Sequence, residues 1–158
     1  MNNTNVFLPT RIIFGPGRLE ELKTLKLPGK KALICVTADG LMEKLGILDR
    51  VEKCLQENGT EYVIFNEVTP NPTKTCVEAA AKLAAENKCD FTMGIGGGSS
   101  IDTAKAAAIL LKTPGDLWDY AYTGTGGRKE VTDAAPIVTI STTCGTGTEV
   151  DQYCVVTN

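Results

Sequence analysis

The sequence predicts an α/β fold in which helices cover both faces of a parallel β-sheet. Short apolar runs alternate along the chain with longer segments whose apolar residues recur every three or four positions. Strands joined by helices of this length need right-handed crossovers, which make the strands parallel. The composition agrees, because 42% hydrophobic and 22% charged residues are typical of a globular domain with an ordinary core.

The first half of the chain predicts an edge element followed by two units of strand and helix. Residues 6–14 predict an N-terminal edge strand or hairpin, which ends at the Gly-Pro-Gly of residues 15–17. Residues 31–36 and 61–65 predict buried strands. The helix after the first of them shows one apolar face, formed by Leu41, Leu45, Leu48, Val51 and Leu55. The helix after the second has Val77, Ala80, Ala81 and Ala84 on one side.

The second half predicts two more strands, at residues 90–95 and 136–140. The helix between them is lined by Ile101, Ala104, Ala108 and Leu111. The glycine- and threonine-rich residues 123–130 predict an exposed loop. Residues 153–158 resemble a strand and stop without a tail, so we expect the native chain to continue beyond Asn158.

Net charge and hydropathy exclude some classes of binding partner for this chain. A formal net charge of −3 argues against a nucleic-acid partner. No stretch approaches the roughly 18 consecutive apolar residues of a membrane span, and the N-terminus lacks the basic and apolar parts of a signal peptide. We therefore expect no membrane partner, a cytoplasmic location, and one domain over residues 1–158.

The residue types that are missing exclude several kinds of chemistry. The sequence has no histidine, which rules out Ser-His-Asp and Cys-His catalysis and any histidine-containing metal site within this chain. Its six cysteines form no C-x-x-C pair, so neither a zinc ribbon nor a thioredoxin-type motif is present. We interpret them as reduced, mostly buried thiols.

A glycine-rich turn follows the third predicted strand and opens a predicted helix. Glycines without a Cβ let backbone N–H groups approach a phosphate, and the positive end of a helix dipole attracts it. Gly96, Gly97 and Gly98 supply such donors, and Ser99 and Ser100 add hydroxyl groups. The turn is neither a Walker A loop nor a complete G-x-G-x-x-G fingerprint. It predicts phosphate binding.

A purely structural interpretation of the same turn is a helix cap. Ser99 would be the N-cap, and Asp102 would act as the carboxylate of a capping box. Both interpretations can hold together. Three consecutive glycines exceed what a cap requires, since each extra glycine costs roughly 0.5–1 kcal/mol of backbone entropy.

A second glycine-rich turn, at residues 141–149, leaves the end of the fourth predicted strand. In a parallel sheet it lies at the same carboxyl edge as the first turn, which is where open α/β sheets bind ligands. Its hydroxyl groups, from Thr142, Thr143 and Thr146, suit ribose or diphosphate oxygens. The alternative is a polar loop whose threonines cap their own backbone.

These strings together resemble the iron-containing (group III) alcohol dehydrogenases over essentially the whole chain. The matching segments are Gly96-Gly-Gly-Ser-Ser-Ile-Asp-Thr-Ala-Lys105, Thr142-Thr-Cys-Gly-Thr-Gly-Thr-Glu-Val150, Arg11-Ile-Ile-Phe-Gly-Pro-Gly17, Asn71-Pro72 and Pro114-Gly-Asp-Leu-Trp-Asp119. The resemblance implies a Rossmann-like N-terminal domain that holds NAD or NADP. It also implies a helical C-terminal domain whose aspartate and three histidines bind Fe²⁺ or another divalent metal. The present chain resembles only the first domain.

The resemblance implies roles for individual residues. Gly97, Gly98 and Ser99 contact the pyrophosphate, Asn71 lies near the adenosine portion, and the three threonines of the second turn line the nicotinamide side. The strand-end carboxylate that holds a ribose hydroxyl in NAD-preferring members falls on Ala38, with Asp39 beside it, so the choice between NAD and NADP stays open. Asp151 stands where the family commonly has threonine. The candidate cofactor-binding residues are Asp39, Asn71, Gly96, Gly97, Gly98, Ser99, Ser100, Asp102, Thr142, Thr143 and Thr146.

The leading hypothesis is thus the cofactor half of a metal-dependent alcohol dehydrogenase, which transfers hydride between NAD(P)(H) and an alcohol or aldehyde. Without the metal domain, the chain alone should not turn over alcohol. The resemblance also implies association through the N-terminal extended segment, so we expect a homodimer. Two alternatives are a stand-alone nucleotide-binding or regulatory module without catalysis and a truncated piece that serves only in oligomerisation.

Overall fold

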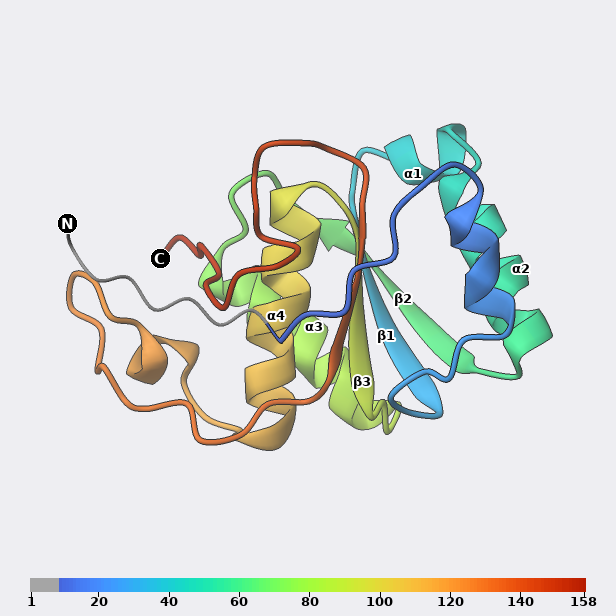
Figure 1. Ribbon diagram of the computed structural model, residues 1–158. Coiled ribbons are helices and arrows are strands. Elements are labelled where there is room, and N and C mark those ends of the chain that lie inside the picture. Colours follow the sequence, from blue (N-terminus) through green and yellow to red (C-terminus); the bar gives the residue numbers. More distant parts are fainter. Residues whose placement is uncertain (1–8) are drawn as a thin grey trace, which may run out of the picture.

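A parallel four-stranded sheet forms the centre of the molecule. The computed structural model describes residues 9–158. The strands are β1 (Lys31–Thr37), β2 (Glu61–Val68), β3 (Phe91–Gly96) and β4 (Ile137–Ser141), in the order β2-β1-β3-β4. Each neighbouring pair is parallel, which confirms the predicted sheet (Figure 1).

Helices cover both faces of the sheet, also as predicted. They are the 3₁₀ helices η1 (Arg18–Lys23) and η2 (Leu117–Tyr120) and the α-helices α1 (Leu41–Lys44), α2 (Ile47–Asn58), α3 (Lys74–Glu86) and α4 (Gly98–Lys112). Side chains alternate along a strand, so β1 packs on both layers. Leu33 and Cys35 belong to the core with α3 and α4, and Ile34 and Val36 belong to the core with α1 and α2.

The single helix predicted after β1 is in fact two helices, α1 and α2. Gly46 separates them, and its φ of 65° is the left-handed conformation that interrupts a right-handed helix. The break turns two predicted face residues away from the core: Leu41 is 44% exposed and Leu45 is 60% exposed. Leu48, Val51 and Leu55 are buried, as expected from their spacing.

The predicted N-terminal strand is not formed in the part of it that the structure describes, residues 9–14. Pro9 lacks the N–H group that a ladder needs. The Thr10 hydroxyl donates to the Val150 carbonyl at 3.3 Å, so this segment contacts the C-terminal loop instead of a strand. Ile12 and Phe14 are 68% and 91% exposed. Residues 6–8 of the prediction lie outside the described residues.

The C-terminal residues were predicted to be strand-like, but they make only an isolated bridge between Thr157 and Thr73. Thr157 N–H donates to the Pro72 carbonyl at 2.9 Å, and Lys74 N–H donates to the Thr157 carbonyl at 2.8 Å. Two bonds tie the chain end to the start of α3, too few for a continuous strand. Residues 123–130 carry no helix or strand, consistent with the predicted loop.

Close packing of α4 against β3 fixes the position of the first glycine turn. An added Cβ at Gly94 would lie 2.7 Å from the Cα of Ile101, so only glycine allows this approach. The Thr92 hydroxyl donates to the Ala104 carbonyl at 3.0 Å across the same contact. Among residues 9–158, no helix has the length and apolar character needed to cross a bilayer.

Candidate dinucleotide-binding site

The strand order places a crevice at the carboxyl ends of β1 and β3. From β1 the chain moves outward to β2, then returns through α3 to β3 on the other side of β1. Ligands of open α/β sheets bind at such a point, where the strand order reverses. Asp39 follows β1 and Gly97 follows β3, so two of the candidate residues lie at this edge.

The first glycine turn presents the N-terminus of α4 to this edge. Gly96 has a φ of 132°, and Gly97 is the N-cap of α4 without any side-chain cap. The N–H groups of Gly98, Ser99 and Ser100 belong to the first helical turn, where no preceding carbonyl can accept from them within the helix. The N-cap interpretation of Ser99 is therefore wrong, because the helix begins one residue before it.

The two serines of the turn have different surroundings. Ser99 accepts a hydrogen bond at its Oγ from the Asn71 N–H at 3.2 Å, and Asn71 has a φ of 54°. Ser100 is fully buried, and among the described residues its Oγ has no hydrogen-bond partner. A Cβ at Gly96 would lie 3.0 Å from this oxygen, so the hydroxyl faces the glycine turn. Unsatisfied buried hydroxyls are rare and point to a missing partner.

The two glycine turns meet. Thr142 N–H donates to the Gly96 carbonyl at 2.9 Å. An added Cβ at Gly97 would lie 3.2 Å from the Thr143 Oγ1, tighter than most real contacts. A Cβ at Gly98 would lie 3.6 Å from the Cγ2 of Thr146. The strand ends therefore bring the glycines of one turn against the threonines of the other, as the shared sheet edge predicts.

A hollow of about 370 Å³ lies beside the joined turns. Small-molecule sites have volumes of this order. Its lining residues are Asn71, Pro72, Gly98, Ser99, Asp102, Thr146, Thr148, Asp151, Tyr153 and Val155. Five of the predicted site residues are thus among them. The remaining candidates do not line it, and these are Asp39, Gly96, Gly97, Ser100, Thr142 and Thr143.

Asp39 is exposed at the end of β1 and does not line the hollow. Its Oδ1 accepts from Leu41 N–H at 3.0 Å and from the Thr37 hydroxyl at 2.8 Å. These bonds, the one from Leu41 first, hold the pKa of the Asp39 carboxyl below its usual value. The side chain is therefore a carboxylate acceptor at neutral pH.

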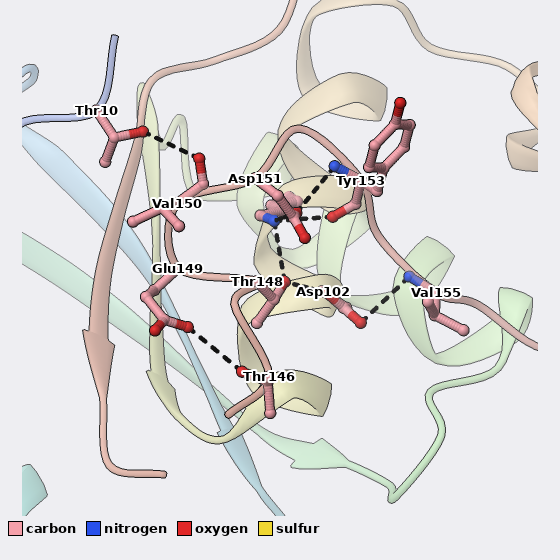
Figure 2. A network of polar contacts seen from close by, with 10 residues as sticks. Thr10, Asp102, Thr146, Thr148, Glu149, Val150, Asp151, Tyr153 and Val155 are labelled. Atoms are coloured by element: carbon pink, nitrogen blue, oxygen red, sulfur yellow. Dashed lines mark hydrogen bonds and ion pairs between the residues drawn. The ribbon is translucent and has the colours of Figure 1, made fainter. Parts of the chain in front are cut away.

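A polar network that sequence spacing did not reveal closes one side of the hollow (Figure 2). The Lys105 ammonium group donates to Asp151 Oδ1 at 2.7 Å, to Thr148 Oγ1 at 2.9 Å and to the Tyr153 carbonyl at 2.8 Å. Asp102 accepts from the Thr148 hydroxyl and, at 3.2 Å, from Val155 N–H. Asp102 thus does not cap α4, contrary to the capping-box interpretation, and instead anchors the C-terminal segment.

The described residues offer no group of three or more histidine, cysteine, aspartate or glutamate side chains that could hold a metal. Cys35, Cys54 and Cys89 are buried, Cys76 and Cys154 are half-buried, and Cys144 of the second turn is exposed. Burial raises the pKa of the Cys154 thiol to about 11, with the Asp102 carboxylate adding to the effect. The residues present do not fit a metal centre.

A parallel sheet with a glycine-rich turn and a helix N-terminus at its switch point defines a Rossmann-like α/β domain. Residues 9–158 match the family model for iron-containing alcohol dehydrogenases. The chain belongs to that family.

Individual relatives agree with this assignment. The chain is 38% identical over its whole length to a protein of Bacillus subtilis named "Probable NADH-dependent butanol dehydrogenase 2", of which it covers 40%. It is 35% identical over 98% of its length to the NAD-dependent methanol dehydrogenase of Bacillus methanolicus, and again covers 40%. The crystal structure of NADH-dependent butanol dehydrogenase A from Thermotoga maritima matches with a TM-score of 0.90 and 33% identity, over 100% of this chain and 39% of that one. The chain therefore spans about two fifths of these relatives.

Proposed function

We propose that this chain is the NAD(P)-binding part of a metal-dependent alcohol dehydrogenase, which transfers hydride between NAD(P)(H) and an alcohol or aldehyde. The observation that carries the proposal is the junction of the two glycine turns at the N-terminus of α4. Membership of the family and the names of the relatives support the reaction class.

The residues at the junction suit a pyrophosphate. Free N–H groups of Gly98, Ser99 and Ser100 point from the helix end, and the helix dipole adds a partial positive charge there. The unpartnered Ser100 hydroxyl is a further donor facing the glycine turn. Thr142, Thr143 and Thr146 add polar groups from the second turn. The chain's own contribution is to bind and orient the cofactor along the sheet edge.

The proposed reaction also needs a metal site and a substrate-binding site, which we place outside this chain. Fe²⁺ or another divalent ion, when bound in a complete enzyme, would polarise the alcohol oxygen. Because the described residues hold no metal set, we propose that a further domain provides it. An alcohol or aldehyde as substrate, assembly as a homodimer and a cytoplasmic location are parts of the same proposal.

Calorimetric titration of the purified chain tests the proposal. We expect saturable binding of NAD⁺ or NADP⁺, with ADP-ribose, which keeps the pyrophosphate, binding at the same site. Asp39 at the end of β1 predicts a preference for NAD⁺, because a carboxylate repels a 2′-phosphate. Absence of binding of both dinucleotides at millimolar concentration would overturn the proposal.

A further inference from the structure

The second glycine turn is held at both of its ends. At its start, Thr142 N–H donates to the Gly96 carbonyl at 2.9 Å. At its end, the buried Thr148 hydroxyl accepts from the Lys105 ammonium group at 2.9 Å and donates to the Asp102 carboxylate. The stretch between these points forms no helix or strand, so the two attachments decide where the turn lies.

Lys105 is the centre of the second attachment. Its side chain is 9% exposed, and all three of its N–H groups are used. Besides Thr148 they bind Asp151 Oδ1 at 2.7 Å and the Tyr153 carbonyl at 2.8 Å. Thr148 gives its only hydroxyl proton to Asp102, so neither Lys105 nor Thr148 has a donor left for a ligand.

The network places the turn against the N-terminus of α4. Gly98, Asp102 and Lys105 are spaced by four and three residues, which puts them on one face of the helix. A Cβ at Gly98 would lie 3.6 Å from the Cγ2 of Thr146 and 3.9 Å from that of Thr148. Thr148 and Thr146 therefore lie beside the helix end whose N–H groups are proposed to bind the pyrophosphate.

The lysine at this place is not explained by packing. A buried ammonium group is costly unless it is fully paired, and an apolar side chain would fill the same volume without that cost. An apolar side chain could not, however, fix three oxygen atoms of a segment that lacks regular structure. These oxygens belong to Thr148, Asp151 and Tyr153, so Lys105 sets the path of the chain after the second turn.

We propose that Lys105 is a positioning residue of the dinucleotide site, which holds the second glycine turn in place beside the first through Thr148. This proposal rests on the proposed function and goes beyond it, because Lys105 is not among the residues that line the hollow. Asp102 has the same role, since its carboxylate holds Thr148 and, at 3.2 Å, the Val155 N–H. Removal of the ammonium group should displace the second turn and leave the N–H groups of α4 in place.

Lys105→Met is the direct test, because methionine keeps most of the length of the side chain and removes the ammonium group. Calorimetry on the whole chain measures the affinities for NAD⁺ and ADP-ribose, at a temperature where circular dichroism shows the variant to be folded. We expect both affinities to fall about three- to tenfold. Hydrogen exchange should increase in the backbone of residues 142–155 and stay as in the parent chain in β1.

Lys112→Met is the matched control, since Lys112 is exposed in the last turn of the same helix and the substitution makes the same change in net charge. It should change neither the affinities nor the exchange of residues 142–155.

The pair Thr148→Val and Thr148→Ser separates positioning from packing, and it decides the question if Lys105→Met does not fold. Valine has the shape of threonine without its hydroxyl, whereas serine keeps the hydroxyl that joins Lys105 to Asp102. We expect Thr148→Val to share the loss of affinity and Thr148→Ser to bind more tightly than Thr148→Val.

Two kinds of result would overturn the inference while leaving the proposed function intact. One is unchanged affinity in folded Lys105→Met, or Thr148→Val that binds no more weakly than Thr148→Ser. The other is an increase in exchange that is as large in β1 as in residues 142–155, because Lys105 would then stabilise the whole fold. Failure of the parent chain to bind NAD⁺, NADP⁺ and ADP-ribose would overturn the proposed function and, with it, this inference.

Discussion

Thr142 donates its backbone N–H to the carbonyl oxygen of Gly96 at 2.9 Å, and this bond joins the turns that follow β3 and β4. It extends the pairing of the two strands, whose last matched residues are Gly96 and Ser141. The turns are therefore held at a fixed separation by the sheet itself. A phosphate-binding surface built this way depends on residues small enough to keep the turns together.

Gly97→Val should weaken dinucleotide binding more than about tenfold, or 1.4 kcal/mol. Gly97 has a φ of −90°, so the conformation itself suits other residues and the obstacle is space. Its added Cβ would press on Thr143 at 3.2 Å, and the larger branches would occupy room beside the phosphate turn. Calorimetry measures the affinity, and thermal unfolding monitors the fold.

A comparison of the single variant Gly97→Ala with the double variant Gly97→Ala/Thr143→Ala separates crowding between these two residues from other effects of the substitution. Removing the Thr143 hydroxyl and methyl should relieve the alanine Cβ and recover part of the lost thermal stability. Wild-type affinity in Gly97→Val would refute a phosphate role for this turn.

The purified chain should not oxidise alcohols, even when Fe²⁺ or Zn²⁺ is added. The chain has no histidine, and its described acidic and cysteine side chains form no metal-binding group. Absorbance of the reduced nicotinamide at 340 nm follows the reaction, with ethanol and butanol as substrates and a chelator as control. Cofactor reduction that depends on added metal would disprove this expectation.

Local pattern was sufficient to predict the layers of this fold. The continuous apolar run of β1 and the spacing of Leu48, Val51 and Leu55 each predicted burial correctly. The same spacing wrongly predicted that Leu41 and Leu45 are buried. Gly46 adopts the left-handed backbone conformation and ends the first helix there, although the apolar residues continue with the same period. The prediction of an N-terminal strand was wrong because a composition rich in β-forming residues does not by itself provide a neighbouring strand to pair with.

The parts of the candidate site formed by residues close together in the sequence could be predicted. Both glycine turns follow strands, so their common sheet edge could be inferred. The Lys105 network could not, since its partner Asp151 is 46 positions away and the contact depends on how the C-terminal segment folds back over α4. Asp102 and Lys105 are three residues apart on one helical face, which is the single local signal for that network.

Asp90 should stabilise the fold at neutral pH and lose this effect in acid. Its carboxylate accepts from the backbone N–H groups of Lys30 at 2.8 Å and of Lys31 at 2.9 Å, at the start of β1. Burial raises the pKa of the Asp90 carboxyl, but the backbone hydrogen bonds together with the nearby Lys30 charge outweigh it, and the net pKa lies below its usual value. A depressed carboxyl pKa means that the stabilisation is complete above the ordinary value, about pH 4, and disappears as pH falls through the lowered one.

Asp90→Ala should therefore cost roughly 1 kcal/mol at pH 7, allowing for the solvent exposure of this group. The difference between variant and parent should shrink toward pH 3. Urea unfolding at pH 7, 5 and 3 measures it, and Glu86→Ala, at the exposed end of α3, serves as the comparison. A difference that stays constant over this range would show that the carboxylate charge is not involved.

The exposed apolar side chains near the N-terminus should contribute to self-association. Ile12 and Phe14 are 68% and 91% exposed, although apolar residues of this size gain about 1.5–3 kcal/mol each when buried. They lie on a segment that forms no strand between residues 9 and 14, so its backbone groups are available to a second copy. Light scattering at micromolar concentration should show a dimer or larger species for the parent chain and a lower mass for Ile12→Ser with Phe14→Ser. Leu45→Ser is the control, because Leu45 is 60% exposed on the α1 side and should not change the mass. An undiminished mass in the double variant would assign the association to another surface.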